Sequence, residues 1–269
     1  MKLDGARVLL TGASSGIGAA LAPILAERGA KVGIVARREQ RLREVLDRCR
    51  EFAPESRMWA ADLADLERAE HVALEAWDAF GVIDALVNNA AIPKRTHVAD
   101  LTPADVEHLM DVDFHSPVRM TLALLPRMLE RARGTVLFVS SMGGRIPIAN
   151  ESAYNAAKFA MCGWAEAMYL DLAGTGVDVK LVLPGPIATE IWEQPDNVPA
   201  LIDVDKVPAA DCAAGIADAL EGDGFEYYVP REFPGGIDAR QLAVGKHATC
   251  DDFLRGMADF TKALRGRAT

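Results

Sequence analysis

Short runs of apolar residues alternate along the chain with longer segments whose apolar residues recur every three or four positions. Most of the short runs are almost continuous, which is typical of strands covered on both faces. The pattern predicts strands at 6–11, 31–36, 57–61, 83–88, 134–140, 177–183 and 225–230, and helices near 16–29, 39–52, 65–80, 103–131, 152–173 and 209–221. This alternation indicates an α/β protein with a parallel sheet and helices on both of its faces.

The overall composition is that of an ordinary globular protein, with 50% hydrophobic and 25% charged residues. There are 29 basic and 39 acidic residues, and the basic ones are scattered, so we expect no nucleic-acid partner. No apolar run approaches the roughly 18 residues that a membrane span needs. The first apolar run is broken at Thr11 and Gly12, too early for a signal-peptide core. We therefore expect a single soluble domain over residues 1–269, located in the cytoplasm.

Metal binding is not predicted. His97, His108 and His115 lack the spacing of metal ligands, and no two cysteines form a CxxC pair. The cysteines, which we expect to be free thiols, are Cys49, Cys162, Cys212 and Cys250.

A glycine-rich turn follows the first predicted strand and opens the first predicted helix. It reads Thr11-Gly12-Ala13-Ser14-Ser15-Gly16-Ile17-Gly18. Glycines allow a tight turn and a close approach of the backbone to a diphosphate, which the free N–H groups of the helix then bind. A purely structural turn is the alternative, but the position between strand and helix favours a dinucleotide site.

The end of the second predicted strand bears on which dinucleotide is bound. Sites for NAD usually carry an acidic residue there, whereas this chain has Ala36, Arg37 and Arg38. A small residue leaves room for a 2′-phosphate, and arginines supply suitable donors. We predict NADP(H) as the cofactor; the alternative is that both arginines are solvated residues at the start of a basic helix.

The second chemical pattern combines Ser140-Ser141 with Tyr154 and Lys158. Residues four apart share one face of a helix, so Tyr154 and Lys158 project together. An ammonium group lowers the pKa of a nearby phenol from its usual value near 10, which suits proton exchange with an alcohol or carbonyl oxygen. A serine at the preceding strand end is expected to hold the same oxygen. A tyrosine and a lysine on the surface of an amphipathic helix are the alternative.

Together these motifs resemble the short-chain dehydrogenase/reductase family, in the branch with a TGxxxGIG turn and a YxxxK motif. The resemblance covers roughly residues 5–190 and implies a Rossmann-type, doubly wound parallel sheet of about seven strands. Its parts occur in order at Thr11–Gly18, Asp62-Leu63, Asn88–Ala91, Ser140-Ser141, Tyr154–Lys158 and Pro184–Thr189.

The resemblance also implies roles for single residues. Asp62 and Leu63 would meet the adenine, Ser141 would be the catalytic serine, and Lys158 would also hold the nicotinamide ribose. Ile187 and Thr189 would contact the carboxamide, and the segment from Asn89 to Ala91 would steady the sheet beside the ribose. The predicted cofactor-binding residues are Thr11, Gly12, Ser14, Ser15, Gly16, Ile17, Gly18, Arg37, Arg38, Asp62, Leu63, Asn89, Ala90, Ala91, Tyr154, Lys158, Pro184, Gly185, Ile187 and Thr189. The predicted catalytic residues are Ser141, Tyr154, Lys158 and Asp113.

Asp113 departs from the family pattern, in which a segment like V-N-x-x-G carries a catalytic asparagine. Here the segment reads Val112-Asp113-Phe114-His115-Ser116. The family residue kinks its helix and holds a water largely through its main-chain carbonyl, which an aspartate also has. We expect the carboxylate to pair with Lys158, weaken its effect on Tyr154 and raise the pH optimum.

The substrate is expected to be a hydrophobic ketone, aldehyde or alcohol. The residues expected to face it, each of which is alternatively a core residue, are Ile92, Pro93, Met142, Ile146, Pro186, Ile191 and Trp192. The region of about 189–269 is expected to be a variable substrate lid and C-terminal region. Within it, 189–208 is predicted to be a long loop, and 239–269 an amphipathic helix that caps the substrate mouth or packs on another subunit.

The function predicted from the sequence is therefore an NADP(H)-dependent oxidoreductase acting on a carbonyl or alcohol carbon. A cofactor-binding regulator with weak or no turnover is one alternative, and an NADP-dependent dehydratase or epimerase of the same superfamily is another. By resemblance, segments 103–131 and 152–173 would form the surface of a homodimer.

Overall fold

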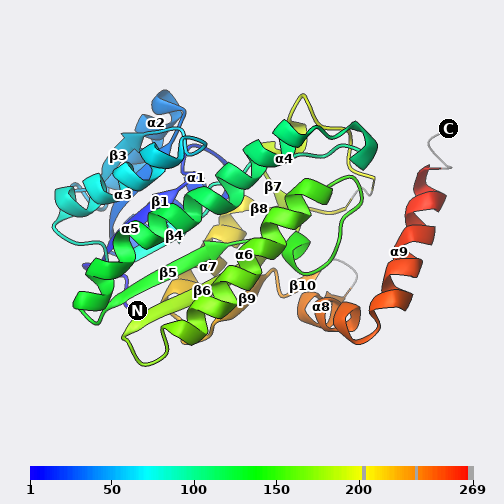
Figure 1. Cartoon of the computed structure of the whole chain (residues 1–269). Helices are drawn as coiled ribbons and strands as arrows, with labels where there is room; N and C mark the ends of the chain where they lie inside the picture. Colours follow the sequence, from blue (N-terminus) through cyan, green and yellow to red (C-terminus); the bar gives the residue numbers. More distant parts are fainter. Residues whose placement is uncertain (202–203, 234–235, 266–269) are drawn as a thin grey trace.

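Seven parallel strands form the centre of the computed structural model, which describes residues 1–201, 204–233 and 236–265 (Figure 1). The strand order is β3-β2-β1-β4-β5-β6-β9. The strands are β1 (Arg7–Thr11), β2 (Lys31–Ala36), β3 (Arg57–Ala60), β4 (Ala85–Asn88), β5 (Gly134–Val139), β6 (Val177–Pro184) and β9 (Glu226–Val229). The order reverses between β1 and β4, and such a switch point is where open α/β sheets bind ligands.

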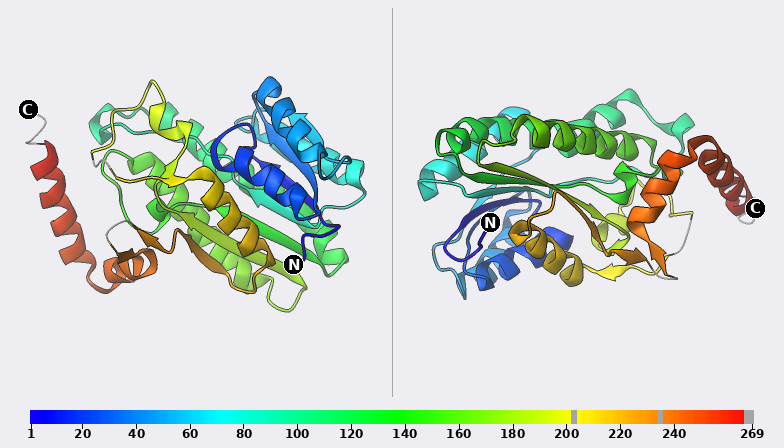
Figure 2. Two further views of the ribbon diagram at one scale, coloured as in Figure 1. Left: turned by 180° about the vertical axis from the view of Figure 1, so that it is seen from behind. Right: turned by 90° about the horizontal axis from the view of Figure 1, so that it is seen from below.

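Helices cover both faces of the sheet (Figure 2). One face packs against α1 (Gly16–Glu27), α2 (Glu39–Arg50) and α7 (Ala209–Glu221), and the other against α3 (Leu66–Phe80), α5 (Ser116–Glu130) and α6 (Ser152–Asp171). Side chains of a strand alternate between faces, so Val8 and Leu10 of β1 lie in one core while Leu9 lies in the other. The predicted doubly wound α/β fold is confirmed.

The predicted helix over 103–131 is interrupted. The structure has α4 (Pro103–Met110), a π-helical turn at Asp111–His115, and then α5. The start of α4 is a capping box, in which the Thr102 hydroxyl accepts from the Asp105 amide and the Asp105 carboxylate accepts from the Thr102 amide. Pro117 has no N–H to donate to the carbonyl of Asp113, which it would meet in a regular helix, so the irregularity falls at Asp113.

The end of the chain was predicted as one helix within 239–269, which is wrong. The structure has α8 (Ala239–Ala248) and α9 (Cys250–Arg265), and residues 266–269 lie outside the described part of the chain. The break falls at Thr249, whose amide and hydroxyl both donate to the Gly245 carbonyl while its own carbonyl accepts from Phe253. Thr249 has φ −135° and ψ 49°, outside the helical region, so the chain turns there. Figure 1 shows α9 standing beside α8, apart from the sheet.

The remaining elements are short. The predicted loop over 189–208 contains a 3-10 turn at Glu190–Glu193, and β7 (Ile187–Ala188) pairs in parallel with β8 (Val207–Pro208). Two strands, β10 (Glu232–Phe233) and β11 (Ile237–Asp238), pair in antiparallel, and 3-10 turns occur at Val98–Asp100 and Met142–Gly144. Over the described ranges, no helix combines the length and apolarity that crossing a membrane requires.

Candidate active site

A cavity of about 880 Å³ opens at the carboxyl ends of the central strands, beside the switch point between β1 and β4. Its walls come from the turn after β1, the ends of β2 and β4, the segments that follow β5 and β6, and the C-terminal helices. Sequence segments that are far apart therefore meet there. This is the position at which a ligand is expected in a doubly wound sheet.

Tyr154 and Lys158 share one face of α6 and both border this cavity. The Nζ atom of Lys158 lies 5.4 Å from the centre of the Tyr154 ring. Ser141 follows β5 in extended conformation, and its Oγ accepts a hydrogen bond of 3.0 Å from the Gly143 amide. Ser140 is engaged elsewhere, because its hydroxyl donates to the Lys158 carbonyl at 3.1 Å. The structure therefore brings Ser141, rather than the Ser140 hydroxyl, together with Tyr154 and Lys158.

Asp113 lies behind Lys158, in the π-helical turn. Its Oδ2 is 3.2 Å from Lys158 Nζ, and the two side chains are 0% and 2% exposed. Its Oδ1 accepts a hydrogen bond of 2.8 Å from the Ile92 amide. Asp113 does not line the cavity, so it can act on a reaction there only through Lys158 and Tyr154.

The electrostatics of this group follow from burial and pairing. Burial raises the pKa of Tyr154; Lys158 opposes this, Asp113 adds to it, and the net shift is upward. Burial by itself lowers the pKa of Lys158, but Asp113 and Tyr154 raise it, and the net shift is again upward. Burial raises the pKa of Asp113 by more than Lys158 and the Ile92 amide lower it. Lys158 therefore remains charged, while the charge of Asp113 offsets part of the effect of Lys158 on the pKa of Tyr154.

The glycine-rich turn leaves a backbone cradle at the start of α1. Gly12 and Gly16 have φ angles of +71° and +53°, and a Cβ on Gly12 would lie 2.7 Å from the Cα of Ala90. The N-cap residue Ser15 makes no side-chain capping bond, so no cap fills the positive end of the helix. These features fit a diphosphate group held by backbone N–H groups.

Two of the predicted cofactor-binding residues lie behind the cradle. The Oγ1 of Thr11 accepts hydrogen bonds from the amides of Asn89 and Ala90, at 2.9 and 3.0 Å. A Cβ on Gly18 would lie 2.4 Å from the Gly12 carbonyl oxygen. Neither residue lines the cavity, so both support the turn from within. The others all line it: Gly12, Ser14, Ser15, Gly16, Ile17, Arg37, Arg38, Asp62, Leu63, Asn89, Ala90, Ala91, Tyr154, Lys158, Pro184, Gly185, Ile187 and Thr189.

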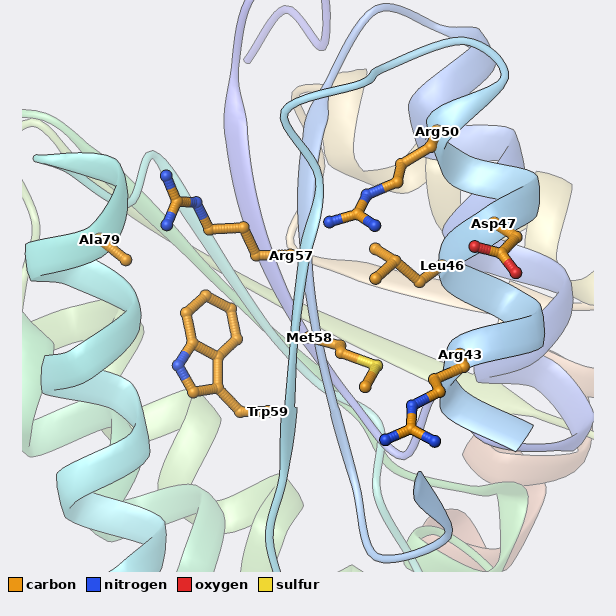
Figure 3. A pocket seen from close by; sticks show the side chains of 8 residues that line it. All are labelled: Arg43, Leu46, Asp47, Arg50, Arg57, Met58, Trp59 and Ala79. Atoms are coloured by element: carbon orange, nitrogen blue, oxygen red, sulfur yellow. The ribbon is translucent and has the colours of Figure 1, made fainter. Parts of the chain in front are cut away.

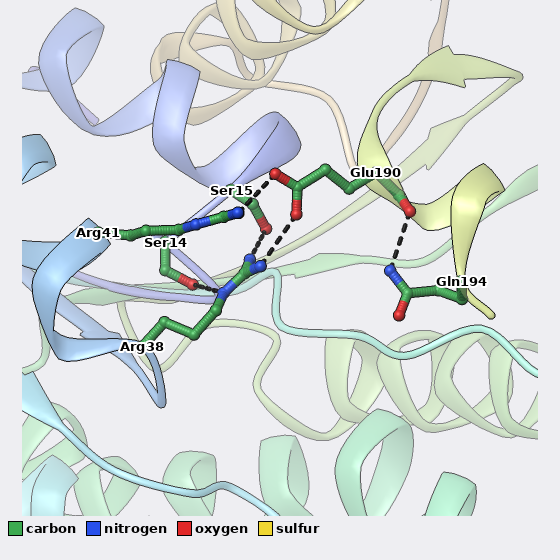
Figure 4. Close-up of polar contacts among 6 residues, drawn as sticks. All are labelled: Ser14, Ser15, Arg38, Arg41, Glu190 and Gln194. Carbon is green, nitrogen blue, oxygen red and sulfur yellow. Dashed lines mark hydrogen bonds and ion pairs between the residues drawn. The ribbon is translucent and has the colours of Figure 1, made fainter. Parts of the chain in front are cut away.

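Arg38 lies over the glycine-rich turn (Figure 4). Its Nε and Nη2 donate to the hydroxyls of Ser14 and Ser15, at 3.3 and 2.5 Å, and its Nη1 pairs with Glu190 at 2.9 Å. Arg41 binds the other oxygen of the same carboxylate. Arg37 is directed elsewhere, with its Nη1 4.0 Å from Oδ2 of Asp62. Arg41 and Glu190 were not predicted as site residues, because no local pattern links the start of α2 to a segment so much later in the chain.

The opposite end of the cavity is largely apolar. All seven residues that were expected to face the substrate lie in its wall: Ile92, Pro93, Met142, Ile146, Pro186, Ile191 and Trp192. The wall also includes further apolar residues: Pro147, Ile148, Ala200, Leu201, Val204, Phe233, Ile237, Leu242, Phe253, Met257, Phe260 and Leu264. Of the two positions predicted for the apolar face of 239–269, at the substrate mouth or against another subunit, the structure places the apolar side chains of α9 at the cavity.

A second pocket, of about 530 Å³, lies at the sheet edge around β3 (Figure 3). There Met58 points toward α2, while Arg57 and Trp59 point to the other side of the strand. This pocket straddles an edge strand and shares no lining residue with the main cavity. Across the described ranges, no group of three or more His, Cys, Asp or Glu residues is arranged to hold a metal ion.

Residues 6–197 match the family model described as short chain dehydrogenase. Among curated proteins, the chain is 36% identical over 211 residues to "Uncharacterized oxidoreductase YxnA" of Bacillus subtilis (strain 168). That alignment covers 77% of this chain and 58% of the relative, so the chain spans less than two thirds of that relative's length.

Solved structures share the fold. A short chain dehydrogenase from Burkholderia cenocepacia J2315, in complex with NADP, superposes with a TM-score of 0.77 at 27% identity, over 94% of this chain and 97% of that one. A short chain dehydrogenase/reductase from Burkholderia phymatum, in complex with NAD, gives 0.78 at 23% identity, over 86% and 91%. The second likeness is one of fold alone.

Proposed function

The chain belongs to the short-chain dehydrogenase family, and on this basis we propose that it is an NADP(H)-dependent oxidoreductase. It interconverts a carbonyl group and an alcohol in a hydrophobic small molecule. The observation that carries this proposal is the meeting of Tyr154, Lys158 and Ser141 at the wall of one cavity, between a cradle for a diphosphate and an apolar chamber.

Tyr154 is the general acid and base in this proposal. In the reducing direction its phenol donates a proton to the carbonyl oxygen as negative charge develops there, and in the oxidising direction the phenolate takes the proton from the alcohol. The Ser141 hydroxyl donates a hydrogen bond to the same oxygen. When bound, NADP(H) supplies or accepts the hydride.

Lys158 stabilises the phenolate form of Tyr154 through its charge. The group is buried, and Asp113 keeps it protonated by raising its pKa against the effect of burial. The buried ammonium therefore favours loss of the Tyr154 proton, while the Asp113 carboxylate opposes that loss. The balance between these two charges sets the pH at which Tyr154 can exchange its proton.

The preference for NADP(H) is supported by the end of β2. The small residue Ala36 is followed by Arg37 and Arg38, and all three border the cavity at the side of Asp62 and Leu63. Arg38 is held at the glycine-rich turn by Ser14 and Ser15. A guanidinium there can donate two parallel hydrogen bonds to a phosphate, which a ribose hydroxyl does not need.

A hydrophobic substrate is supported by the chamber beyond Tyr154. Trp192, Met142 and Ile146 lie in its wall, and the partly exposed Phe253 and Met257 of α9 also border it. Such a wall favours apolar surface near the reacting carbon. In this proposal the region 189–269 shapes the substrate site.

The proposed enzyme is a homodimer that pairs through α5 and α6. The outward sides of these helices expose Leu122, Leu129 and Leu170, the last with 72% of its surface accessible. Exposed leucines on adjacent helices favour burial against a second copy. Cytoplasmic location stays a prediction from the sequence.

The test is oxidation of NADPH and NADH, followed by absorbance, with a panel of hydrophobic ketones, aldehydes and quinones. Turnover that prefers NADPH and is lost in Tyr154→Phe supports the proposal. A second candidate is a regulator that binds the cofactor without turnover, and the observation favouring it is the Asp113 carboxylate on Lys158. Tight NADPH binding with no turnover in wild type, and turnover gained in Asp113→Asn, would favour that candidate.

A further inference from the structure

The arginines at the cofactor end of the cavity already hold an anion supplied by the protein. The Glu190 carboxylate accepts from Arg38 at 2.9 Å through one oxygen and from Arg41 through the other (Figure 4). These two arginines lower the pKa of Glu190, so the carboxylate is charged at neutral pH. Glu190 and Arg38 border the same cavity as the glycine-rich turn.

The residues on either side of Glu190 border different parts of the cavity, the cofactor cradle on one side and the apolar chamber on the other. The preceding residue, Thr189, packs over the turn, since a Cβ on Gly16 would lie 3.0 Å from its methyl group. The following residues, Ile191 and Trp192, line the apolar chamber, and Trp192 Nε1 donates to the Ile187 carbonyl at 2.6 Å. A change at Glu190 is therefore next to both the cofactor cradle and the substrate wall.

The later part of the segment is fixed independently. Arg95, only 4% exposed, donates from its amide to the Asn197 side chain at 2.7 Å and from Nη1 to the Val198 carbonyl at 3.2 Å. Its Nε pairs with Glu151 at 2.9 Å. In contrast, Glu190 and both of its arginine partners are almost half exposed. The Glu190 end can therefore be released without loss of the Arg95 anchor.

We propose that Glu190 is a specificity-determining residue, whose carboxylate occupies the Arg38 position that the 2′-phosphate of NADP(H) takes on binding. This inference rests on the proposed use of NADP(H). NAD(H) has no 2′-phosphate and leaves the Glu190–Arg38 pair in place. NADP(H) has to displace the carboxylate from Arg38, and Glu190 thereby lowers the preference for the phosphorylated cofactor below what the arginines alone would give.

The exchange is physically reasonable because exposed ion pairs are weak. Such a pair contributes little net stabilisation, whereas a phosphate has about twice the charge of a carboxylate and three acceptor oxygens. The guanidinium of Arg38 has five N–H donors and can hold a phosphate in a bidentate manner while it keeps its serine partners. The 2′-phosphate therefore displaces the Glu190 carboxylate from Arg38, and the free energy of breaking that ion pair lowers the affinity for NADP(H).

The test uses the full chain and direct binding of NADP⁺, NAD⁺ and 2′,5′-ADP by isothermal titration calorimetry. In Glu190→Gln, the Kd values of NADP⁺ and 2′,5′-ADP should fall by about fivefold, as expected from loss of weak exposed pairs, while that of NAD⁺ stays within about twofold. Glu193→Gln is the matched control, because it removes the same charge from the same 3-10 turn without touching the arginines. It should leave all three Kd values unchanged.

Several results would overturn the inference. Unchanged or weaker binding of 2′,5′-ADP by Glu190→Gln would show that Glu190 does not compete with the phosphate. Equal tightening of NAD⁺ and NADP⁺ would indicate a general charge effect without selectivity. If neither wild type nor Glu190→Gln binds a 2′-phosphorylated nucleotide, the proposed use of NADP(H) fails as well. If both bind NADP⁺ with the same Kd, only the proposed role of Glu190 is contradicted.

Discussion

Asp113 and Lys158 form a buried ion pair directly behind Tyr154, with 3.2 Å between Oδ2 and Nζ. Lys158 lowers the pKa of Tyr154, but Asp113 and burial raise it, and the net result is a pKa above the ordinary value of tyrosine. The Asp113 carboxylate therefore disfavours the phenolate form of Tyr154, whereas the Lys158 ammonium favours it. The pH dependence of turnover is therefore the property that Asp113 should control.

Asp113→Asn should shift the pH–rate profile toward lower pH by about one unit, since Lys158 then acts on Tyr154 without an opposing charge. In the oxidising direction the phenolate is the active form, so the rise of kcat/KM should begin at a lower pH than in wild type. An asparagine keeps an oxygen for the Ile92 amide, which limits structural damage. A profile that does not move, in a variant with normal circular dichroism and melting temperature, would exclude this electrostatic role.

Tyr154→Phe should lower kcat by about 10²- to 10⁴-fold, the usual contribution of a general acid or base. The ring remains, so the Kd for NADPH should change little. The measurement is NADPH oxidation together with binding followed by protein fluorescence. Tyr169→Phe, on the exposed side of α6, is the control and should behave as wild type. Substantial turnover by Tyr154→Phe would remove this residue from the mechanism.

Arg38→Ala should raise the Kd for NADPH about tenfold or more and that for NADH much less, because a hydrogen bond to a charged group contributes about 1.5–3 kcal/mol. Arg43→Ala is a suitable comparison. Arg43 lies in α2, which begins directly after Arg38, but it pairs with Glu39 and lines the edge pocket instead of the cofactor cavity (Figure 3). Loss of NADH and NADPH affinity in equal measure would argue against contact of Arg38 with the 2′-phosphate.

Phe253→Ser or Met257→Ser should raise KM for long or bulky apolar substrates several-fold, about tenfold at most, because each substitution removes an apolar surface that the substrate would cover. Small ketones that do not reach α9 should be unaffected. Leu254→Ser provides the control, since Leu254 lies on the same helix but not in the cavity wall. Equal effects on small and large substrates, or an equal effect of the control, would contradict a role of α9 in the substrate site.

Leu122→Glu combined with Leu170→Glu should convert the proposed homodimer to a monomer, because the paired helices would bury like charges against one another. Light scattering after gel filtration gives the mass directly. Val98→Glu, an equally exposed apolar position away from α5 and α6, should leave the mass unchanged. A monomeric wild type, or a double variant of dimeric mass, would show that these helices do not form the interface.

The sequence alone predicted the central architecture well. Each of the seven predicted strands occurs within a few residues of its expected position, because buried parallel strands have a continuous apolar pattern and glycine marks the turn before α1. The spacing of Tyr154 and Lys158 on a helix is also a local property. Local periodicity, turn residues and motif order were therefore sufficient for the fold and for the placement of Tyr154 and Lys158 on one face of a helix.

Only the tertiary structure decided what these groups meet. The pairing of Arg38 with Glu190 joins residues 152 positions apart, and no pattern near either residue indicates it. The π-helical turn at Asp113 was indicated only by the family resemblance, as a kink, and the break between α8 and α9 was missed, since each is a local departure inside an otherwise helical pattern. Periodicity reports which face of an element is buried, whereas the partner of each side chain is fixed by the packing of segments from distant parts of the chain.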